Sequence, residues 1–312
     1  MKPIASLTAQ TLVYYAFVLT MMVFAFVLGD SGFFSSENML NIVRQTAPIV
    51  IMAIGFNFAL SVGLLDLSMG AVVALSGLVA AMLLPNYDIT FSVLASLTIG
   101  AAIGALNGIL TVRLAIPSLI ITLGSLIFLS GFVRYISGLE SIPILNQSFL
   151  KLFGSGELLG IPTLLWWVLC VSLGVYIVFQ NLQFGRHLLA IGANADAAYA
   201  MGINKNKVRV MAMSLSGLCA AFAGLLYAGR MQSARYTMGE SELLTVIAAV
   251  AIGGSSIFGG QVSIWGTVFG VWLIGMLNNG LILSGFSSNA QMMVKGIILI
   301  VAVSITVKAR KL

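Results

Sequence analysis

Long apolar runs without charged residues recur along almost the whole of this 312-residue chain. Hydrophobic residues make up 60% of the sequence and charged residues 8%, whereas a soluble domain carries about a quarter charged residues. A helix needs roughly 20 apolar residues to cross the hydrocarbon core of a bilayer. The pattern therefore predicts an all-α polytopic membrane protein, built as a single transmembrane domain over residues 1–312.

The apolar runs divide into ten expected membrane crossings. They are Thr11–Gly29, Thr46–Leu65, Leu67–Leu84, Ile89–Val112, Ile116–Val133, Thr163–Leu182, Val210–Gly229, Leu243–Ile257, Ile264–Ser284 and Ala290–Val307. The eighth run is short and flanked by glycines, so a partly re-entrant helix is the alternative there. Eight crossings remain if two such segments re-enter. A signal peptide competes for the first run, but the run is long for one and no clear A-x-A site follows it.

The basic residues predict which side of the membrane each loop faces. Ten crossings place both ends of the chain on one side. With the N-terminus inside, nine Lys and Arg residues lie on the inner side and six on the outer side. Lys and Arg near span ends are retained in the cytoplasm, so we expect cytoplasmic termini. The net charge of +6 follows from this division between the two sides and does not indicate nucleic-acid binding.

The stretch Gln183–Arg209 is one of the few long polar breaks and carries the only histidine, His187. Within it, Asn194 is a good N-cap, Asp196 suits the first turn, and Gly202 suits the C′ position. These signals predict a short helix over Ala195–Met201. Such a helix is marginal alone, so it needs a surface to lie on. That surface is either the protein's own inner face, which the loop alone slightly favours, or a partner protein.

The expected spans contain few polar side chains, and those near their middles are neutral. The candidates for a solute path are Asn57, Asn107, Thr122, Ser125, Asn278 and Asn279. Neutral amides and hydroxyls suit a polar, uncharged solute, and interhelical hydrogen bonding is the competing role for each of them. Asp66 lies at an inner elbow, where we expect it to cap the helix from Leu67 with help from Ser68.

Two segments echo each other weakly. Ser61–Leu83 and Ala251–Leu277 each have an apolar approach, a Gly/Ser elbow at the inner face and then a helix rich in small residues. In the ten-crossing arrangement both run in the same direction. Small residues let helices approach closely in lipid, and broken helices line polar sites in transporters.

Several absences from the sequence narrow the mechanism. A proton- or sodium-coupled carrier usually needs ionisable groups within the membrane, and none is evident near the middle of a span. The chain has no G-x-x-x-x-G-K-[ST] motif for ATP binding, no metal-ligand cluster and no nucleophile–base pair. Cys170 and Cys219 lie within apolar runs and form no disulfide framework. We therefore expect no cofactor and no catalysis, but a pore-forming subunit powered through a cytoplasmic loop.

Five segments carry a specific resemblance. They are LLDLSMGAVVALSG (Leu64–Gly77), IPSLIITLGSLIFLSGF (Ile116–Phe132), GRHLLAIGANADAAYAMGI (Gly185–Ile203), LSGLCAAFAGLLYAGRMQSA (Leu215–Ala234) and AIGGSSIFGGQVSIWGTVFG (Ala251–Gly270), followed by LNNGL (Leu277–Leu281). The chain resembles the integral membrane permeases of bacterial ABC importers for ribose and related monosaccharides, within the larger family that includes branched-chain amino-acid permeases. One departure is visible: Leu64 and Leu65 precede Asp66, where the family commonly has a Gly-Gly pair.

The resemblance implies partners and a mechanism. Such permeases pair as homo- or heterodimers, bind two cytoplasmic ATPase domains and receive solute from an extracytoplasmic binding protein. It implies a place in the bacterial inner membrane and uptake of a monosaccharide by alternating access. It also shifts the role of the short helix to ATPase docking, through Asn194, Asp196, Ala197, Ala198, Gly202 and Ile203, with Ala198 expected on the docking face. The alternatives are a channel or facilitator without an ATPase, and an amino-acid permease of the same family.

Overall fold

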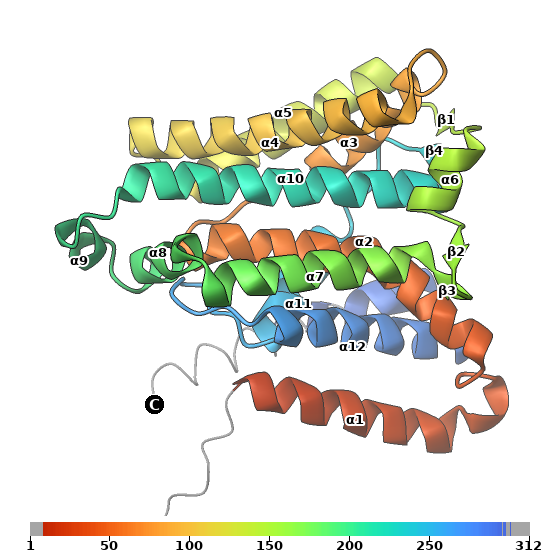
Figure 1. Cartoon of the computed structure of the whole chain (residues 1–312). Helices are drawn as coiled ribbons and strands as arrows, with labels where there is room; N and C mark the ends of the chain where they lie inside the picture. The colour runs from red at the N-terminus through yellow and green to blue at the C-terminus, as the bar shows by residue number, and fades with distance from the viewer. Residues whose placement is uncertain (1–8, 295, 298–299, 301–312) are drawn as a thin grey trace, which may run out of the picture.

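The chain forms one bundle of roughly antiparallel helices (Figure 1), seen in a computed structural model that describes residues 9–294, 296, 297 and 300. Six of its helices are long and apolar enough to cross a membrane: α2 (Ser36–Ser61), α4 (Ile89–Leu114), α5 (Ser118–Ser137), α7 (Thr163–Asn181), α10 (Lys205–Met231) and α12 (Ile264–Leu283). The expectation of an all-α polytopic protein is confirmed at this level, while the count of ten crossings stays a prediction.

The remaining helices lie outside this set. They are α1 (Ala9–Val27), the 3-10 turn η1 (Gly29–Ser31), α3 (Met69–Leu83), α6 (Gln147–Phe153), α8 (Gln183–Ala193), α9 (Ala195–Ala200) and α11 (Leu243–Ile252). A further helical stretch covers residues 288–294. The last expected span, Ala290–Val307, lies largely outside the described residues.

The two ends of the bundle differ in structure (Figure 1). At one, here called the strand end, β1 (Ile142–Pro143) pairs with β4 (Ser233–Ala234), and β2 (Glu157–Leu158) pairs with β3 (Ile161–Pro162). Helices α8 and α9 project at the other, here called the α9 end.

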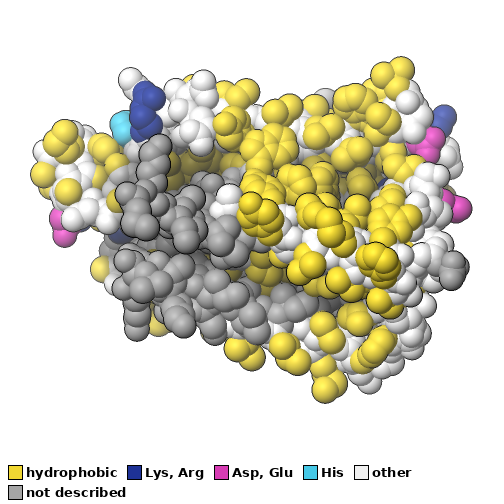
Figure 2. Space-filling model, turned by 90° about the horizontal axis from the view of Figure 1, so that it is seen from below, with side chains coloured by type: hydrophobic (Ala, Val, Ile, Leu, Met, Phe, Trp, Pro, Cys, Tyr) yellow, Lys and Arg dark blue, Asp and Glu magenta, His cyan; other side chains and the backbone are white. Residues whose placement is uncertain are grey.

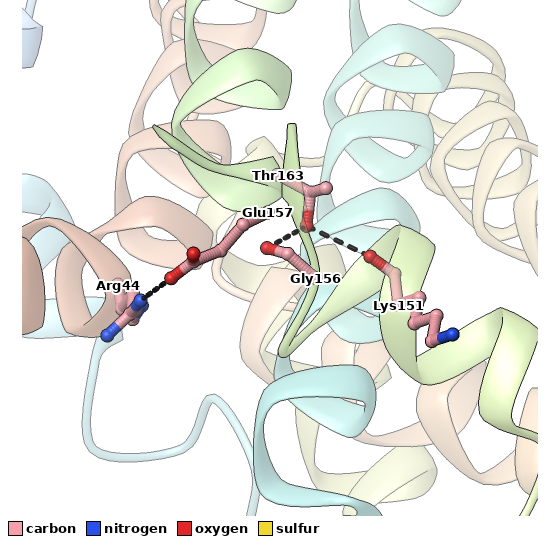
Figure 3. A network of polar contacts seen from close by, with 5 residues as sticks. All are labelled: Arg44, Lys151, Gly156, Glu157 and Thr163. Carbon is pink, nitrogen blue, oxygen red and sulfur yellow. Dashed lines mark hydrogen bonds and ion pairs between the residues drawn. The ribbon is translucent and has the colours of Figure 1, made fainter. Parts of the chain in front are cut away.

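Polar contacts close the strand end (Figure 3). Arg44 of α2 forms an ion pair with Glu157 of β2 at 2.8 Å. The Thr163 hydroxyl, at the start of α7, lies 3.1 Å from the carbonyl oxygen of Lys151 and 3.2 Å from that of Gly156. Exposed ion pairs contribute little stability singly, so these contacts mainly fix the positions of the short strands over the helix ends.

Helix α10 lies at the centre of the bundle and packs against α2, α3 and α4. Glycines make this packing close. A Cβ atom on Gly217 of α10 would meet the carbonyl oxygen of Gly100 in α4, and one on Gly104 would meet that of Met213. Close backbone approach at small residues is the usual way helices associate in lipid, as the small-residue content of the sequence predicts.

The outer surface of the bundle is apolar, as expected of a lipid-facing protein. Figure 2 shows hydrophobic side chains over much of the middle of one face, with coloured charged groups at its two ends. Helix α5 exposes large apolar side chains, among them Ile127 and Phe128 at 68% and 70%. A protein that exposed so many large apolar side chains to water would associate with other molecules, so these side chains are suited to face lipid.

Several boundaries differ from the sequence-based expectation. Helix α2 begins at Ser36, inside the segment expected to be a polar connection, because Ser35 caps it through the backbone N–H of Asn38. Helix α10 begins at Lys205, capped in the same way by Asn204. Helix α8 was not expected; its first residues are polar, and the hydrophobic pattern of Leu188 and Ile191, both buried, was missed. Helix α11 ends at Ile252, so it is shorter still than the expected run.

The elbows of the two echoing segments meet. The backbone N–H of Gly260 donates to the carbonyl oxygen of Ser61 at 3.2 Å. Gly63, Gly259 and Gly260 all have positive φ, a conformation that favours glycine. From these elbows α3 and α12 both run toward the strand end (Figure 1), so the expected common direction is confirmed.

Candidate functional site

A cavity of about 900 Å³, here called the chamber, lies toward the α9 end. Its wall is formed by the elbow before α3, the α4–α5 turn, the start of α10 and parts of the chain around α11. The lining residues are Gly63, Leu64, Leu65, Leu67, Thr111, Val112, Ala115, Ile116, Pro117, Ser118, Leu119, Lys205, Asn206, Arg209, Ile247, Ile257 and Phe258. The lining is mostly apolar, with a few hydroxyls, one amide and two cations.

Asp66 holds the elbow that forms one wall of the chamber. Its carboxyl is fully buried and accepts three hydrogen bonds. The backbone N–H and the hydroxyl of Ser68 donate to Oδ1 at 3.1 and 2.6 Å, and the Ser216 hydroxyl of α10 donates to Oδ2 at 2.8 Å. The expectation that Asp66 caps a helix from Leu67 is corrected: α3 begins at Met69, Ser68 takes the N-cap position, and Asp66 positions Ser68.

A second set of bonds ties the elbow to α4 and α5. The Asn107 amide donates to the Ser68 hydroxyl at 2.9 Å, and the Ser125 hydroxyl donates to the side-chain oxygen Oδ1 of Asn107. The Thr122 hydroxyl lies 3.2 Å from the carbonyl oxygen of Leu65 and 2.8 Å from that of Ser118. Asn107 and Ser125 therefore bond to each other and Thr122 bonds to backbone oxygens, and none of these three solute-path candidates is among the lining residues of the chamber.

The other three candidates lie elsewhere. The Asn57 amide, fully buried, donates to Thr267 of α12 at 2.9 Å. Asn279 and Asn38 exchange amide hydrogen bonds at 2.9 and 3.0 Å. Asn278 lines a separate small cavity near the strand end. The structure thus gives Asn57, Asn107, Ser125 and Asn279 partners across helices, the alternative role that the sequence left open, and ties Thr122 to the elbow backbone.

The polar groups that do line the chamber were missed by sequence reasoning. Thr111 lies in the last turn of α4, Ser118 in the first turn of α5, and Asn206 is the second residue of α10. The candidates from the sequence are polar residues near the middle of each expected span, whereas these three residues lie at helix ends. Pro117, just before α5, was the available signal, because proline is common at helix starts and so marks the turn between α4 and α5.

The short helix at the α9 end forms as expected. The Asn194 side chain accepts from the backbone N–H groups of Asp196 and Ala197. At the other end Gly202 has φ +83, its N–H bonds the carbonyl oxygen of Tyr199, and the N–H of Ile203 bonds that of Ala198. This is the Schellman arrangement. Lys205 adds an ion pair to Asp196 at 3.2 Å.

The exposed face of α9 differs from the expected one. Ala198 is 5% exposed and packs on the protein's own core, so the expectation that it presents itself to a partner is wrong. Ala197 and Ala200 are exposed instead. Tyr199 and Met201 are 65% and 83% exposed, which is unusual for large apolar side chains outside the lipid-facing belt. The free face of α9 is therefore defined by these four residues.

Helix α8 connects α9 to both elbows. A Cβ atom on Gly192 would overlap the carbonyl oxygen of Ser61 and the backbone nitrogen of Gly260. Only glycine lets α8 approach both backbones at once. Helix α8 therefore lies in direct contact with the α2–α3 elbow and the α11–α12 elbow.

These features define a multi-pass membrane protein with a chamber on one side and a projecting short helix beside it. The chain belongs to the family described as "Branched-chain amino acid transport system / permease component", which matches residues 38–303. Membership confirms the resemblance and supports a place in the inner membrane.

Similar proteins with sugar-import names cover most of the chain. The ribose import permease protein of Escherichia coli strain K12 is 37% identical over 276 residues, covering 87% of this chain and 86% of that protein. The Bacillus subtilis ribose import permease protein is also 37% identical, covering 88% and 86%. The D-allose transport system permease protein of E. coli K12 is 32% identical, covering 93% and 89%. No solved structure matches the chain.

Proposed function

We propose that this chain is the transmembrane permease subunit of an ATP-driven importer that moves a monosaccharide into the cytoplasm by alternating access. The observation that carries the proposal is the 900 Å³ chamber beside a projecting, capped helix. The relatives named for ribose, allose and fructose import supply the solute class.

The chamber suits a small neutral solute. Its volume lies within the roughly 300–1,000 Å³ range of small-molecule sites. No carboxylate lines it among the described residues, and its hydroxyl and amide groups at Thr111, Ser118 and Asn206 can exchange hydrogen bonds with sugar hydroxyls. The other lining side chains are mostly apolar and bind such a solute weakly, which favours its release from the chamber.

The α9 end is proposed to face the cytoplasm. In the ten-crossing arrangement nine Lys and Arg residues fall on this side, among them Arg113, Arg186 and Lys205, against six on the strand side, among them Arg44, Arg134 and Lys151. Basic residues at short loops are retained inside. In this arrangement the chain crosses ten times and both termini are cytoplasmic, with α3 and α11 as shortened crossings completed by irregular chain.

Thiol labelling tests the orientation in a background without Cys170 and Cys219. Cysteines at Ser155 and Ser288, both exposed, should react with an impermeant reagent in intact cells. A cysteine at Asn204, exposed beside α9, should react only after permeabilisation. Labelling at Asn204 in intact cells would reverse the orientation.

The proposed partners are a cytoplasmic ABC ATPase, a second permease copy or paralogue, and an extracytoplasmic solute-binding protein. The ATPase docks on the free face of α9, and its closure displaces α9 and α8. Gly192 transmits this displacement to the two elbows, both of which line the chamber. The chamber then opens alternately to the two sides of the membrane. The chain itself contributes no P-loop.

Reconstitution tests the proposal directly. The complex is purified from native membranes through a tag on this chain, its subunits are identified, and uptake into proteoliposomes is measured. A panel of monosaccharides and branched-chain amino acids is offered with and without ATP. ATP-dependent uptake of a monosaccharide is expected. Uptake that is independent of ATP would indicate a facilitator, and uptake of amino acids alone would indicate the other branch of the family.

A further inference from the structure

A second, smaller cavity of about 120 Å³ lies between α2, α10, α11 and α12, away from the chamber and nearer the strand end. It differs from the chamber in its lining, because polar side chains predominate. They are Gln45, Thr46, Tyr227, Arg230, Glu242, Thr245 and Asn278. None of these residues belongs to the site described above except Asn278, which was a solute-path candidate.

Three oxygen atoms of this lining have no hydrogen-bond partner among the described residues. They are Oε2 of Glu242, Oγ1 of Thr245 and Oδ1 of Asn278, each with almost no accessible surface. The Thr245 side chain as a whole is 6% exposed. Buried oxygens are normally hydrogen-bonded, so three such atoms in the lining of one cavity indicate a shared ligand.

The chemistry of the lining identifies the kind of ligand. A carboxylate oxygen and an amide oxygen only accept hydrogen bonds, so the ligand must donate. The cavity has room for about four water molecules at ~30 Å³ each. A further cation is disfavoured, since the Arg230 guanidinium already lines the cavity, next to the Tyr227 ring at 5.7 Å from its centroid.

We infer that this cavity binds a cluster of ordered water molecules that donates hydrogen bonds to Glu242, Thr245 and Asn278. The cluster joins the first turn of the short helix α11 to α12, and it lies against Tyr227 and Arg230 of α10. The inference does not depend on transport or on the proposed partners.

Radiolytic hydroxyl-radical labelling tests the inference, because water bound inside a protein generates radicals where it lies. Tyr227 is only 6% exposed, and Met52 and Met213 are fully buried in the core. With water in the cavity, mass spectrometry of the purified wild type should find Tyr227 oxidised while both methionines are spared. A Tyr227 as protected as these reactive methionines would overturn the inference.

Variants locate the water. Thr245→Val keeps the side-chain shape, removes one acceptor and should lower Tyr227 oxidation. Asn278→Leu removes an acceptor, fills space and should lose most of the oxidation. Ser172→Ala is the matched control, since the Ser172 hydroxyl is also buried without a described partner but does not line this cavity. Equal labelling in all three variants would contradict the assignment.

The remaining outcome concerns cations. Wild-type labelling is repeated with choline in place of sodium and potassium. Unchanged oxidation of Tyr227 is expected for a water cluster. Oxidation that rises when the alkali cations are removed would mean that a cation occupies the cavity and excludes water, and would overturn the inference.

Discussion

Asp66 and Glu242 lie in comparable places but have different surroundings. Each carboxyl precedes a short helix within the bundle, α3 in one case and α11 in the other. Asp66 is fully buried and both of its oxygens accept bonds from Ser68 and Ser216. Glu242 has one oxygen bonded only to its neighbour Ser241 at 3.2 Å and the other without a described partner, beside a polar cavity.

The difference indicates which part of the bundle is fixed and which can adjust. A fully satisfied buried network has one arrangement, and removing a member leaves donors unpaired. A carboxylate that bonds water can change partners at little cost. We therefore expect the α3 elbow to be a rigid support, and the start of α11 to be a contact that tolerates substitution and movement.

The largest effect is expected from Asp66→Ala. This change leaves the donors of Ser68 and Ser216 without their acceptor inside the bundle. Unpaired buried donors cost ~1–3 kcal/mol each, so the folded yield in membranes should fall steeply and the thermal transition of the remainder should drop. Detergent-solubilised samples would be compared by size-exclusion chromatography and thermal unfolding. A variant as stable as the wild type would show that Asp66 does not hold the elbow rigid.

A smaller loss of stability but a large loss of function is expected from Gly192→Val. The new side chain would press on the backbones of Ser61 and Gly260 and force α8 away from both elbows. Uptake should fall much more than folded yield. Gly174→Val is the matched control, because no atom lies within 4 Å of a Cβ built there. Equal activity of the two variants would show that the elbows do not follow α8.

An amide substitution at each acid compares the two regions directly. Asp66→Asn puts an N–H₂ group where donors already point, and should lower the free energy of unfolding by roughly 1–3 kcal/mol. Glu242→Gln should change it by less, since water bound at its free oxygen can reorient to suit an amide. Thermal unfolding of both variants in one detergent provides the measurement. A larger shift for Glu242→Gln than for Asp66→Asn would reverse the comparison.

The sequence predicted much of the fold because its signals are local. The caps at Asn194 and Gly202 follow from residue chemistry at adjacent positions, and the structure places both as expected. The apolar runs located the ends of each long span to within a few residues, except that α2 and α10 begin earlier in the sequence than expected.

The site was less predictable because its contacts are long-range. The Asn107–Ser68 bond joins positions on two helices, and nothing local distinguishes an amide that faces a chamber from one that faces a helix. The face of α9 was predicted wrongly for the same reason: Ala197, Ala198 and Ala200 are the same residue type, and only the packing of α9 on the bundle buries Ala198.

The central claim is that the free face of α9 binds the ATPase that drives uptake. Co-purification of the ATPase with this chain tests it most directly, in Ala200→Arg, where an exposed small side chain becomes large and charged. Leu145→Arg, at an 82% exposed position at the strand end, is the matched control. We predict that Ala200→Arg keeps normal membrane yield but loses the ATPase and ATP-dependent uptake, whereas Leu145→Arg retains the ATPase. Full retention of the ATPase in Ala200→Arg, with normal uptake, would contradict the account.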